Sequence, residues 1–336
     1  MRQALLSSLL LLPFAACGSE PAQANTYPLE APLGLQKAAL VAPLVDNELT
    51  AAKAELGKHL FFDPRLSASG KMGCVNCHYP DKAFTDGLAH SVKDDGGKNS
   101  RNSPTMYNVG YYPELYWDGR KTGLEANVLA AWTGQLAGKP EEVSSRLNAV
   151  AGYRKRFDAA FGGEANEERV VHALSAFLRT LRTGNSAYDR FQQGDQGALS
   201  DAAKQGYQLF TGKAGCIVCH QPPLFVDKLY HNVGIGMQAE DPDVGRAKPT
   251  GDAKLTGAFK TPTLREAART APYFHDGSVA TLREAVKLMA SGGIDNPHKD
   301  PLILDRQLTD AEIDQLVAFV ESLNGDVAWR DPELPK

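Results

Sequence analysis

The sequence predicts an all-α protein built from two similar helical domains, and three observations lead to this prediction. The chain has 336 residues, which at roughly 150 residues per domain is enough for two separate cores. Apolar residues recur with helical spacing in several segments, and loops rich in Gly and Pro separate those segments. The chain also repeats itself: Ala176-Phe177-Leu178 and Ala318-Phe319-Val320 follow two similar cysteine motifs at the same distance.

The composition excludes two classes of protein. Hydrophobic residues make up 43% of the chain, which is too many for a disordered protein. The 36 Lys and Arg residues nearly balance the 40 Asp and Glu residues, so the net charge is only −4. This charge does not suit an electrostatic nucleic-acid binder, and we expect no nucleic-acid partner.

The N-terminus predicts export. Arg2 precedes a short apolar run that ends near residue 12, far below the roughly 18 residues that a membrane span needs. Residues 1–16 are therefore a predicted signal peptide, and Cys17 lies in a segment that resembles a lipoprotein cleavage box. Ordinary cleavage near Ala22 or Ala24 is the alternative. Residues 18–32 form a predicted tether, and we expect membrane contact only through the lipid on Cys17.

The predicted helices cover, in chain order, 49–60, 124–132, 141–148, 167–182, 201–211, 282–289 and 310–323. Those at 167–182 and 310–323 carry apolar stripes that suit core packing, and Thr309 with Glu312 forms a capping box before the last one. We place the first domain at 33–191, a linker at 192–200, the second domain at 201–326 and a C-terminal tail at 327–336.

Each domain contains one C-x-x-C-H string: Cys74-Val75-Asn76-Cys77-His78 and Cys216-Ile217-Val218-Cys219-His220. This spacing is the attachment signature of a c-type haem, in which the two sulfurs form thioethers and the adjacent histidine binds the iron. Two zinc half-sites would leave both histidines unexplained. A redox-active cysteine pair lacks the βαβ context that it usually has. The sequence thus predicts two covalently attached haem c groups.

The two repeats differ where a sixth iron ligand would lie. Pro104-Thr105 pairs with Pro262-Thr263 at an offset of 158 residues, and the same offset pairs Ala131 with Met289. Methionine as the sixth ligand raises the reduction potential, whereas alanine cannot bind iron. We therefore expect haem 2, held by His220 and Met289, to carry electrons, and haem 1, held by His78, to open a face to a small oxidant. A methionine that only packs in the core is the alternative.

Three further motifs carry a family resemblance: Arg101-Asn102-Ser103-Pro104-Thr105, Trp117-Asp118-Gly119-Arg120 and the stretch from Ala271 to Ser278. With the haem motifs, they resemble the bacterial di-haem cytochrome c peroxidases and the related MauG-type maturases. The resemblance implies two cytochrome c-like domains that face each other. Met289 stands where the peroxidases have methionine and the maturases have tyrosine, which favours a peroxidase.

The resemblance also implies partners and further site residues. Electrons from a small cytochrome c or a cupredoxin would enter at haem 2, pass Trp117 and reduce hydrogen peroxide at haem 1. Asn102, Thr270 and Pro272 match positions that bind a calcium ion between the domains. We expect the protein in the periplasm, tethered to the outer membrane if Cys17 is lipidated, and a homodimer is one possible assembly.

The match to the family is incomplete beside haem 1. The family uses a glutamine and a glutamate there to move a proton between the peroxide oxygens. The corresponding positions hold Asn127 and about Ala137, and Gln135, Glu141 or Glu142 are candidates to replace the acid. His90 lies in the loop that carries a displaceable iron ligand in many relatives, although about four residues early. A solvent-facing loop histidine is the alternative.

Two other functions remain open beside peroxide reduction. A maturase or oxygenase would use haem 1 to oxidise a protein or an organic substrate, and the altered segment at 132–137 suggests this alternative. A di-haem electron-transfer protein without catalysis would need a strong ligand, such as His90, to close haem 1.

Overall fold

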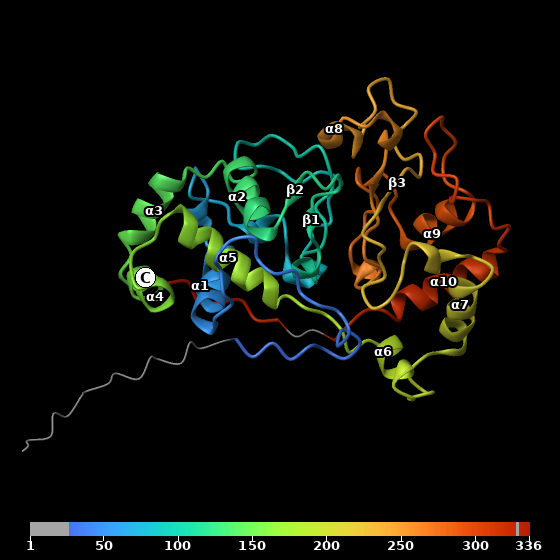
Figure 1. Cartoon of the computed structure of the whole chain (residues 1–336), viewed down its shortest axis with the longest axis horizontal. Coiled ribbons are helices and arrows are strands. Elements are labelled where there is room, and N and C mark those ends of the chain that lie inside the picture. The colour runs from blue at the N-terminus through green and yellow to red at the C-terminus, as the bar shows by residue number, and fades with distance from the viewer. Residues whose placement is uncertain (1–26, 327–328) are drawn as a thin grey trace, which may run out of the picture.

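The computed structural model describes residues 27–326 and 329–336, which form two helical lobes side by side (Figure 1). The predicted signal peptide and Cys17 lie outside the described residues. The first lobe contains α1 (Ala51–Phe62), α2 (Leu124–Gly134), α3 (Pro140–Asn148), α4 (Ala151–Phe161) and α5 (Glu167–Thr180). The second contains α6 (Ala187–Gln192), α7 (Asp201–Thr211), α8 (Ala247–Thr250), α9 (Leu282–Ala290) and α10 (Asp310–Glu321).

Each lobe is built around one close helix crossing, α1 on α5 in the first and α7 on α10 in the second. A glycine makes each crossing possible. A Cβ on Gly57 would clash with the carbonyl oxygen of Ala173, and a Cβ on Gly206 would clash with that of Gln315. The two lobes thus repeat one packing solution, which confirms the predicted pair of similar helical domains.

Two separate cores lie around these crossings. The first contains Leu56, Leu60 and Phe177, and the second contains Phe210 and Phe319, each at most 3% exposed. Tyr188 of α6 packs in the second core, so α6 belongs with the second lobe by its contacts. The predicted boundary after residue 191 instead placed this helix in the first domain. The difference arises because α6 lies just before the linker but folds forward onto α7 and α10.

Two short antiparallel ladders lie between the helical parts of the lobes (Figure 1). β1 (Glu114–Leu115) pairs with β2 (Lys121–Thr122), and β3 (Tyr230–His231) pairs with β4 (Phe259–Lys260). The lobes also bind each other here. Arg246 donates two hydrogen bonds to Glu114, at 2.8 and 3.0 Å, and Tyr230 donates a third at 2.8 Å.

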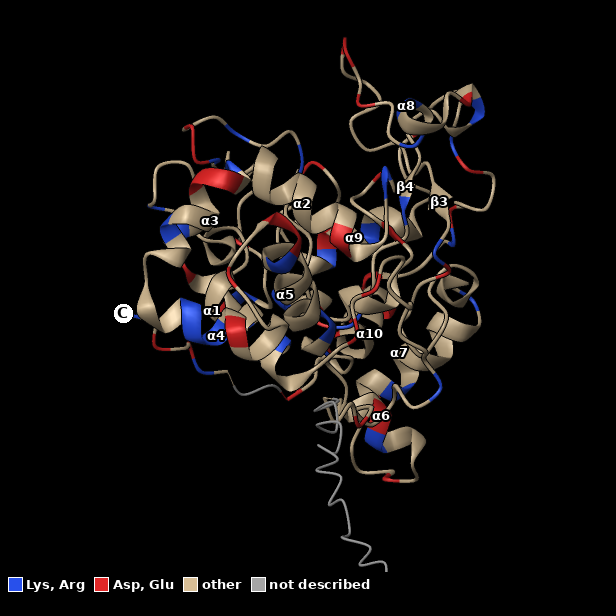
Figure 2. Ribbon diagram, turned by 60° about the vertical axis from the view of Figure 1, so that its left-hand side comes forward, with Lys and Arg blue, Asp and Glu red and all other residues tan. Residues whose placement is uncertain are grey.

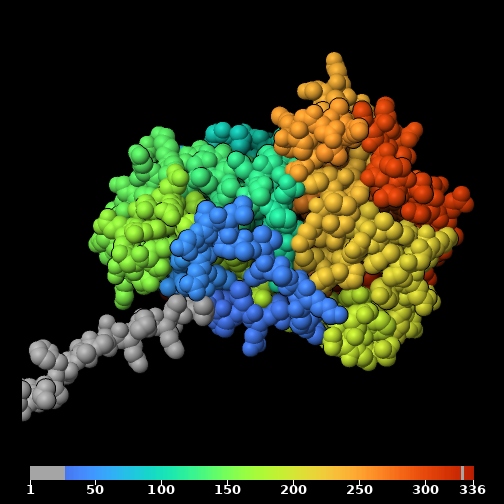
Figure 3. Space-filling view, in the orientation of Figure 1, coloured from blue at the N-terminus to red at the C-terminus, as the bar shows by residue number. Residues whose placement is uncertain are grey.

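Both ends of the described chain cross from one lobe to the other. The N-terminal segment runs over the junction on the face seen in Figure 3, and the carbonyl oxygen of Leu33 accepts a hydrogen bond from Asn185. The C-terminal segment leaves α10 and ends beside α4 (Figure 1), where Gly152 donates to the carbonyl oxygen of Lys336. The sequence described 327–336 only as a tail and did not predict this return.

The charges and the helices agree with the sequence. Figure 2 shows acidic and basic residues interspersed over both lobes. The seven predicted helices are present, with ends within two residues of the prediction. The capping box forms, since Glu312 accepts from the Thr309 backbone at 2.8 Å. The sequence missed α4, α6 and α8, which are short or carry few apolar residues. No described helix is long and apolar enough to cross a membrane.

Candidate functional site

A cavity of about 530 Å³ lies between the lobes, and both cysteine motifs line it. The motifs form matching 3-10 turns, Cys74–Asn76 and Cys216–Val218, which aim each motif at the cavity from opposite lobes. The other predicted site residues on its wall are Met289, Trp117, Asn127, Asn102, Thr270 and Pro272. The fold therefore brings into one space the residues that the sequence places more than 200 positions apart.

Both motif histidines are oriented as iron ligands are. The Nδ1 of His78 lies 2.8 Å from the carbonyl oxygen of Phe84, and that of His220 lies 2.9 Å from the carbonyl oxygen of Phe225. An Nδ1–H donor at these positions leaves Nε2 free to bind a metal. Burial lowers the pKa of both imidazoles, against the opposing effect of the two carbonyl groups. Each ring is thus held neutral, the form that binds iron.

The motif cysteines form no disulfides in the described chain. Burial raises the pKa of Cys74 to about 12 and those of Cys77 and Cys216 to about 11. A redox-active C-x-x-C pair needs the opposite shift, because the thiolate is the reactive form. The structure therefore disfavours a thiol redox site, as the sequence did.

The rest of the cavity wall fits haem. Haem has a large apolar ring and two negatively charged propionates, so its site needs apolar surface and cations. Among the described residues on the wall there are no Asp or Glu side chains. The cationic side chains on it are Arg101, Arg120, Lys260, Arg265 and Arg306. Two cysteine pairs, two neutral histidines and this cationic lining are the donor set that two c-type haems need.

The first-lobe end of the cavity is lined by one face of α2. Asn127, Ala131 and Gln135 are spaced by four residues and all reach the wall. The Gln135 Oε1 atom is buried and has no hydrogen-bond partner within the described part of the chain. Glu141 and Glu142 are exposed and lie outside the cavity lining, while Ala137 is also off the wall. Of the candidates to replace the acid, the structure brings only Gln135 to the cavity.

Trp117 is part of a backbone bridge between the lobes. Its indole N–H donates to the carbonyl oxygen of Asn102 at 2.9 Å, and the Asn102 N–H donates to the carbonyl oxygen of His275 at 2.8 Å. The Trp117 carbonyl oxygen in turn accepts from the Lys260 N–H of β4 at 2.8 Å. The ring is therefore fixed at the junction, on the wall that both motifs share.

Lys260 was not identified from the sequence, because a single lysine in a loop carries no signal. Its ammonium group donates to the carbonyl oxygen of Glu114 at 3.1 Å and lies 4.9 Å from the centre of the Tyr112 ring. Burial lowers the pKa of Lys260 to about 8, although Glu114 and Asp118 oppose the shift. A positive charge is thus held in the cavity wall beside Trp117.

His90 is the predicted site residue that does not line this cavity. Its ring is half-buried, and its Nδ1 atom is buried without a partner among the described residues. The preceding Ala89 packs so closely on Gly277 that no Cβ would fit there. Burial, with nearby Arg101 and His90, lowers the pKa of His275 to about 4, although Asp276 and Asp243 oppose the shift. His90 therefore lies at the junction of the lobes, near His275.

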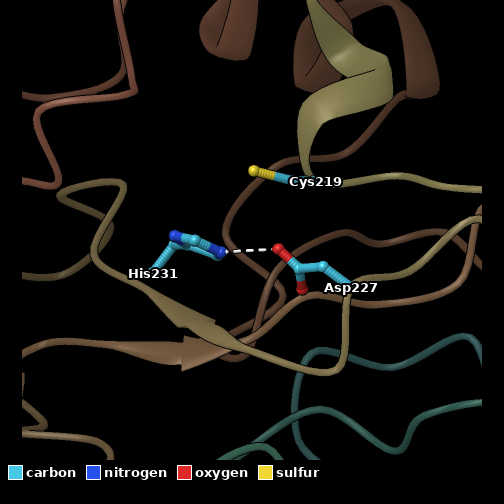
Figure 4. Close-up of side chains that lie close together, drawn as sticks. All are labelled: Cys219, Asp227 and His231. Atoms are coloured by element: carbon cyan, nitrogen blue, oxygen red, sulfur yellow. Dashed lines mark hydrogen bonds and ion pairs between the residues drawn. The ribbon is translucent and has the colours of Figure 1, made fainter.

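Cys219, Asp227 and His231 lie close together beside the second motif (Figure 4). His231 is held at 2.8 Å from Asp227 and at 2.6 Å from Asp300. Such a group resembles a metal site, but the Cys219 sulfur would supply no thiolate if it carried a haem. His231 lines the cavity and forms ion pairs with Asp227 and Asp300, and the sequence analysis did not identify this group.

Comparisons with known proteins agree with this geometry. The family model for di-haem cytochrome c peroxidase matches residues 51–197, and the model for cytochrome c matches residues 203–324. The chain is 37% identical to the methylamine utilization protein MauG of Methylophilus methylotrophus, over 84% of this chain and 85% of the relative. It is 38% identical to the cytochrome-c peroxidase IdrP1 of Denitromonas iodatirespirans, over 86% of each.

Solved structures show the same fold. A MauG-like protein associated with microbial copper homeostasis superposes with a TM-score of 0.79 at 32% identity, covering 85% of this chain and 94% of that one. The diheme peroxidase BthA of Burkholderia thailandensis superposes with a TM-score of 0.71 at 21% identity, covering 86% and 90%. The two lobes are therefore cytochrome c-like domains, as the sequence predicted.

Proposed function

Because the chain belongs to the family of di-haem cytochrome c peroxidases and MauG proteins, we propose that it reduces hydrogen peroxide with electrons from a small redox protein. Haem bound at each motif would supply one-electron chemistry, with peroxide activated at haem 1. The observation that carries the proposal is the difference between the two ends of one cavity. Met289 lines the second-lobe end, whereas Ala131 stands at the corresponding place on α2.

The residues of this chain have distinct roles in the proposal. His78 and His220 hold the irons through neutral imidazoles that Phe84 and Phe225 orient. Met289 would be the sixth ligand of haem 2, which would raise the potential of that haem and suit it to accept electrons. Trp117, fixed by its hydrogen bond to Asn102, provides an aromatic ring on the cavity wall that both motifs line.

Peroxide would bind against the α2 face beside Ala131, where the side chain leaves room. The amides of Asn127 and Gln135 line this position and donate hydrogen bonds to the peroxide oxygens. Tyr116 also lines it, and burial raises the pKa of Tyr116, against the effects of Arg120 and Gln135. The phenol thus stays protonated and can donate a hydrogen bond to the departing oxygen. This set replaces the carboxylic acid that the family uses.

The proposal is tested with the holoprotein in its fully oxidised and half-reduced states, with peroxide and a reduced small cytochrome c. We expect peroxide-dependent oxidation of the donor. Gln135→Ala should lower kcat/KM for peroxide by about 10- to 100-fold, because a hydrogen bond to a group that develops charge is worth about 1.5–3 kcal/mol. Thr133→Ala, an exposed change on the same helix, is the matched control. No donor oxidation in either state would refute the proposal.

Electron entry at haem 2 is supported by the surface around its end of the cavity. Val218, Leu302 and Leu304 line the cavity and are 51%, 50% and 53% exposed. Charges on the helices of the second lobe are paired with one another, as in Lys213 with Glu312 and Lys287 with Asp310. We propose that the donor docks here through apolar contact, so its KM should depend weakly on salt.

A calcium ion between the domains is also part of the proposal. Asn102, Thr270 and Pro272 share the cavity wall, and the Asn102 side chain donates through its nitrogen to the carbonyl oxygen of Leu88 at 2.8 Å. Calcium accepts amide and carbonyl oxygen ligands. Removal of calcium with a chelator should disturb the Trp117–Asn102 bridge, which tryptophan fluorescence and the haem spectra would report. An unchanged protein that contains no calcium after purification would refute this part.

A MauG-like oxidation of another protein or an organic substrate is the second candidate. The MauG relatives and the absence of a carboxylate on the described cavity wall favour it. Slow turnover of ordinary donors, together with a long-lived oxidised state after peroxide addition, would identify this function. A purely electron-transferring role needs a ligand that closes haem 1. His90→Ala tests it, because unchanged spectra would show that His90 is not that ligand.

The location and assembly remain proposals. We propose a periplasmic protein, in line with the predicted signal peptide. Metabolic labelling with a fatty acid would test lipidation of Cys17, and a Cys17→Ala chain is the control. Sedimentation of the holoprotein would distinguish a monomer from a homodimer.

A further inference from the structure

The C-terminal segment places one aromatic side chain against the first-lobe core. The Trp329 ring stacks on Phe62, with ring centres 5.7 Å apart and planes 14° from parallel. It meets Phe84 edge-on at 5.2 Å and Phe177 at 5.9 Å. The Lys58 ammonium lies 4.9 Å above the indole. Trp329 thus belongs to the core of the first lobe, although it follows the last helix of the second.

The end of the chain is fastened beyond Trp329. Arg65 donates to the carbonyl oxygen of Pro335 at 2.9 Å, and Gly152 donates to that of Lys336 at 3.2 Å. The indole N–H donates to Asp331 at 2.8 Å. These contacts hold the segment on the first lobe at more than one point, so the position of Trp329 does not depend on its ring alone.

The Phe84 residue that Trp329 contacts is the one that orients His78. Its carbonyl oxygen lies 2.8 Å from His78 Nδ1, and its side chain is fully buried. Its φ is +59°, a left-handed conformation that a bulky residue adopts only when its surroundings impose it. The ring is confined by Tyr107 at 5.1 Å, Phe61 at 5.9 Å and Trp329 at 5.2 Å. Trp329 is therefore one of the three aromatic rings that fix Phe84 and, with it, this carbonyl group.

In the second lobe, aromatic rings surround Phe225 as they surround Phe84, but the ring that corresponds to Trp329 comes from a different segment. Phe225, with a φ of +56°, is fully buried and presents its carbonyl oxygen to His220. Phe225 meets Tyr188 edge-on at 5.3 Å, and Tyr188 lies 5.7 Å from Phe319. Trp329 has the same relation to Phe84 and Phe177. Tyr188 comes from α6, the first helix of the second lobe, whereas the first lobe obtains its ring from the end of the chain.

We propose that Trp329 is a positioning residue for haem 1, which fixes the Phe84 carbonyl group and through it the His78 ring. The proposal rests on the proposed function, in which His78 binds the iron of haem 1. A hydrogen bond to Nδ1 sets the orientation of the imidazole and its basicity toward the metal. Loss of the indole lets Phe84 relax, weakens that hydrogen bond and makes His78 a weaker ligand. Tyr188 has the same role for His220 and haem 2.

The experiment compares Trp329→Ala and Tyr188→Ala in the full chain with both haems attached. In the proposed function, reduced haem 1 would have an open face and would give an iron–histidine stretching band in resonance Raman spectra, whereas haem 2, with Met289 as a further ligand, would give none. We expect Trp329→Ala to lower the frequency of this band and raise the midpoint potential of haem 1, with haem 2 unchanged. Tyr188→Ala should leave the band in place and shift the potential of haem 2.

Two outcomes would overturn the proposal. One is a folded Trp329→Ala protein with two haems and an unchanged iron–histidine band. The other is an equal shift of both haems, which a merely structural role would produce. If the alanine variant does not accumulate, Trp329→Leu is used in its place, because leucine keeps the apolar bulk but lacks the aromatic ring. A smaller shift in the same direction supports the proposal, and an unchanged band refutes it.

This test can fail separately from the proposed function. A wild-type protein without peroxidase activity would refute peroxide reduction and still give the iron–histidine band. A His78→Gly protein whose band is unchanged would show that His78 is not the ligand, which refutes the haem 1 assignment itself. A shifted band in Trp329→Ala with normal donor oxidation in the wild type supports both.

Discussion

The contacts of Arg246 with the first lobe should contribute measurably to the free energy of unfolding of the whole protein. Arg246 donates two hydrogen bonds to Glu114 and two to the carbonyl oxygens of Asp118 and Gly119, at 2.8–3.0 Å. Its guanidinium also lies 4.2 Å from the centre of the Tyr230 ring. Arg246→Ala removes these contacts and leaves the cavity lining intact, since neither Arg246 nor Glu114 is part of it.

The expected loss follows from these contacts. Glu114 is a third exposed, so we assign only about 1 kcal/mol to the ion pair. The two hydrogen bonds to carbonyl oxygens contribute about 1 kcal/mol each, and the stacking about 0.5 kcal/mol. The free energy of unfolding should fall by about 3.5 kcal/mol at pH 7. With an m-value of about 3 kcal/mol/M, the urea midpoint should fall by about 1 M.

The pH dependence provides a second measurement. Burial raises the pKa of Glu114, but Arg246, Tyr230 and Lys260 outweigh it and hold the pKa below its ordinary value of 4.5. A carboxylate with a lowered folded-state pKa stabilises the protein above the unfolded-state pKa, and this stabilisation is lost as the pH falls through the folded-state pKa. The difference between wild type and Arg246→Ala should therefore be full at pH 7 and become smaller below about pH 4.5.

Urea unfolding at pH 7 and pH 4, followed by tryptophan fluorescence and haem absorption, measures both quantities. Lys248→Ala, an exposed cation on α8, is the matched control and should change the stability by less than about 0.5 kcal/mol. A loss below about 0.5 kcal/mol for Arg246→Ala would refute the reasoning, because the surface ion-pair value alone would then exceed it. A difference that does not depend on pH would refute the role of Glu114.

Three further predictions concern the helix crossing and the two ends of the cavity. Gly57→Ala should destabilise the protein by about 1–3 kcal/mol or more in thermal unfolding, because its Cβ meets the Ala173 carbonyl oxygen, whereas Gly134→Ala has nothing within 4 Å and should be harmless. Ala131→Met should close haem 1, so that cyanide no longer changes the spectrum of the oxidised protein; normal cyanide binding by this variant would show that position 131 is not at the sixth-ligand site. Met289→Leu should lower the midpoint potential of haem 2 in a redox titration, and an unchanged potential would show that Met289 only packs.

Local patterns explain why so much of the fold was predictable. The C-x-x-C-H strings define their own chemistry within five residues, and the apolar stripe of α5 and the capping box of α10 define helices within a dozen. The repeat allowed a prediction over a longer distance, because the fixed offset between the two halves aligns Ala131 with Met289. α4 was missed because its two buried aromatic residues, Tyr153 and Phe157, are too few to form a stripe.

The environment of haem 1 could not be predicted in the same way. Gln135, Glu141 and Glu142 were equal candidates in the sequence, and only the direction of α2 distinguishes the one that reaches the cavity. His90 lies in a loop whose path depends on contact with Gly277 of the other lobe. Sequence separation carries no information about which side chains share a wall, because packing between lobes decides it.

By itself, the sequence determined the two helical domains, the two haem motifs and the difference between Ala131 and Met289 at matching positions of the repeat. Those properties depend on residues that are neighbours along the chain or related by the repeat. Only the tertiary structure decided that both motifs open into one cavity, that Arg246 joins the lobes at Glu114, and that Trp329 completes the core behind His78. These contacts form only when distant segments lose their freedom together, and burial of apolar surface between them stabilises the result.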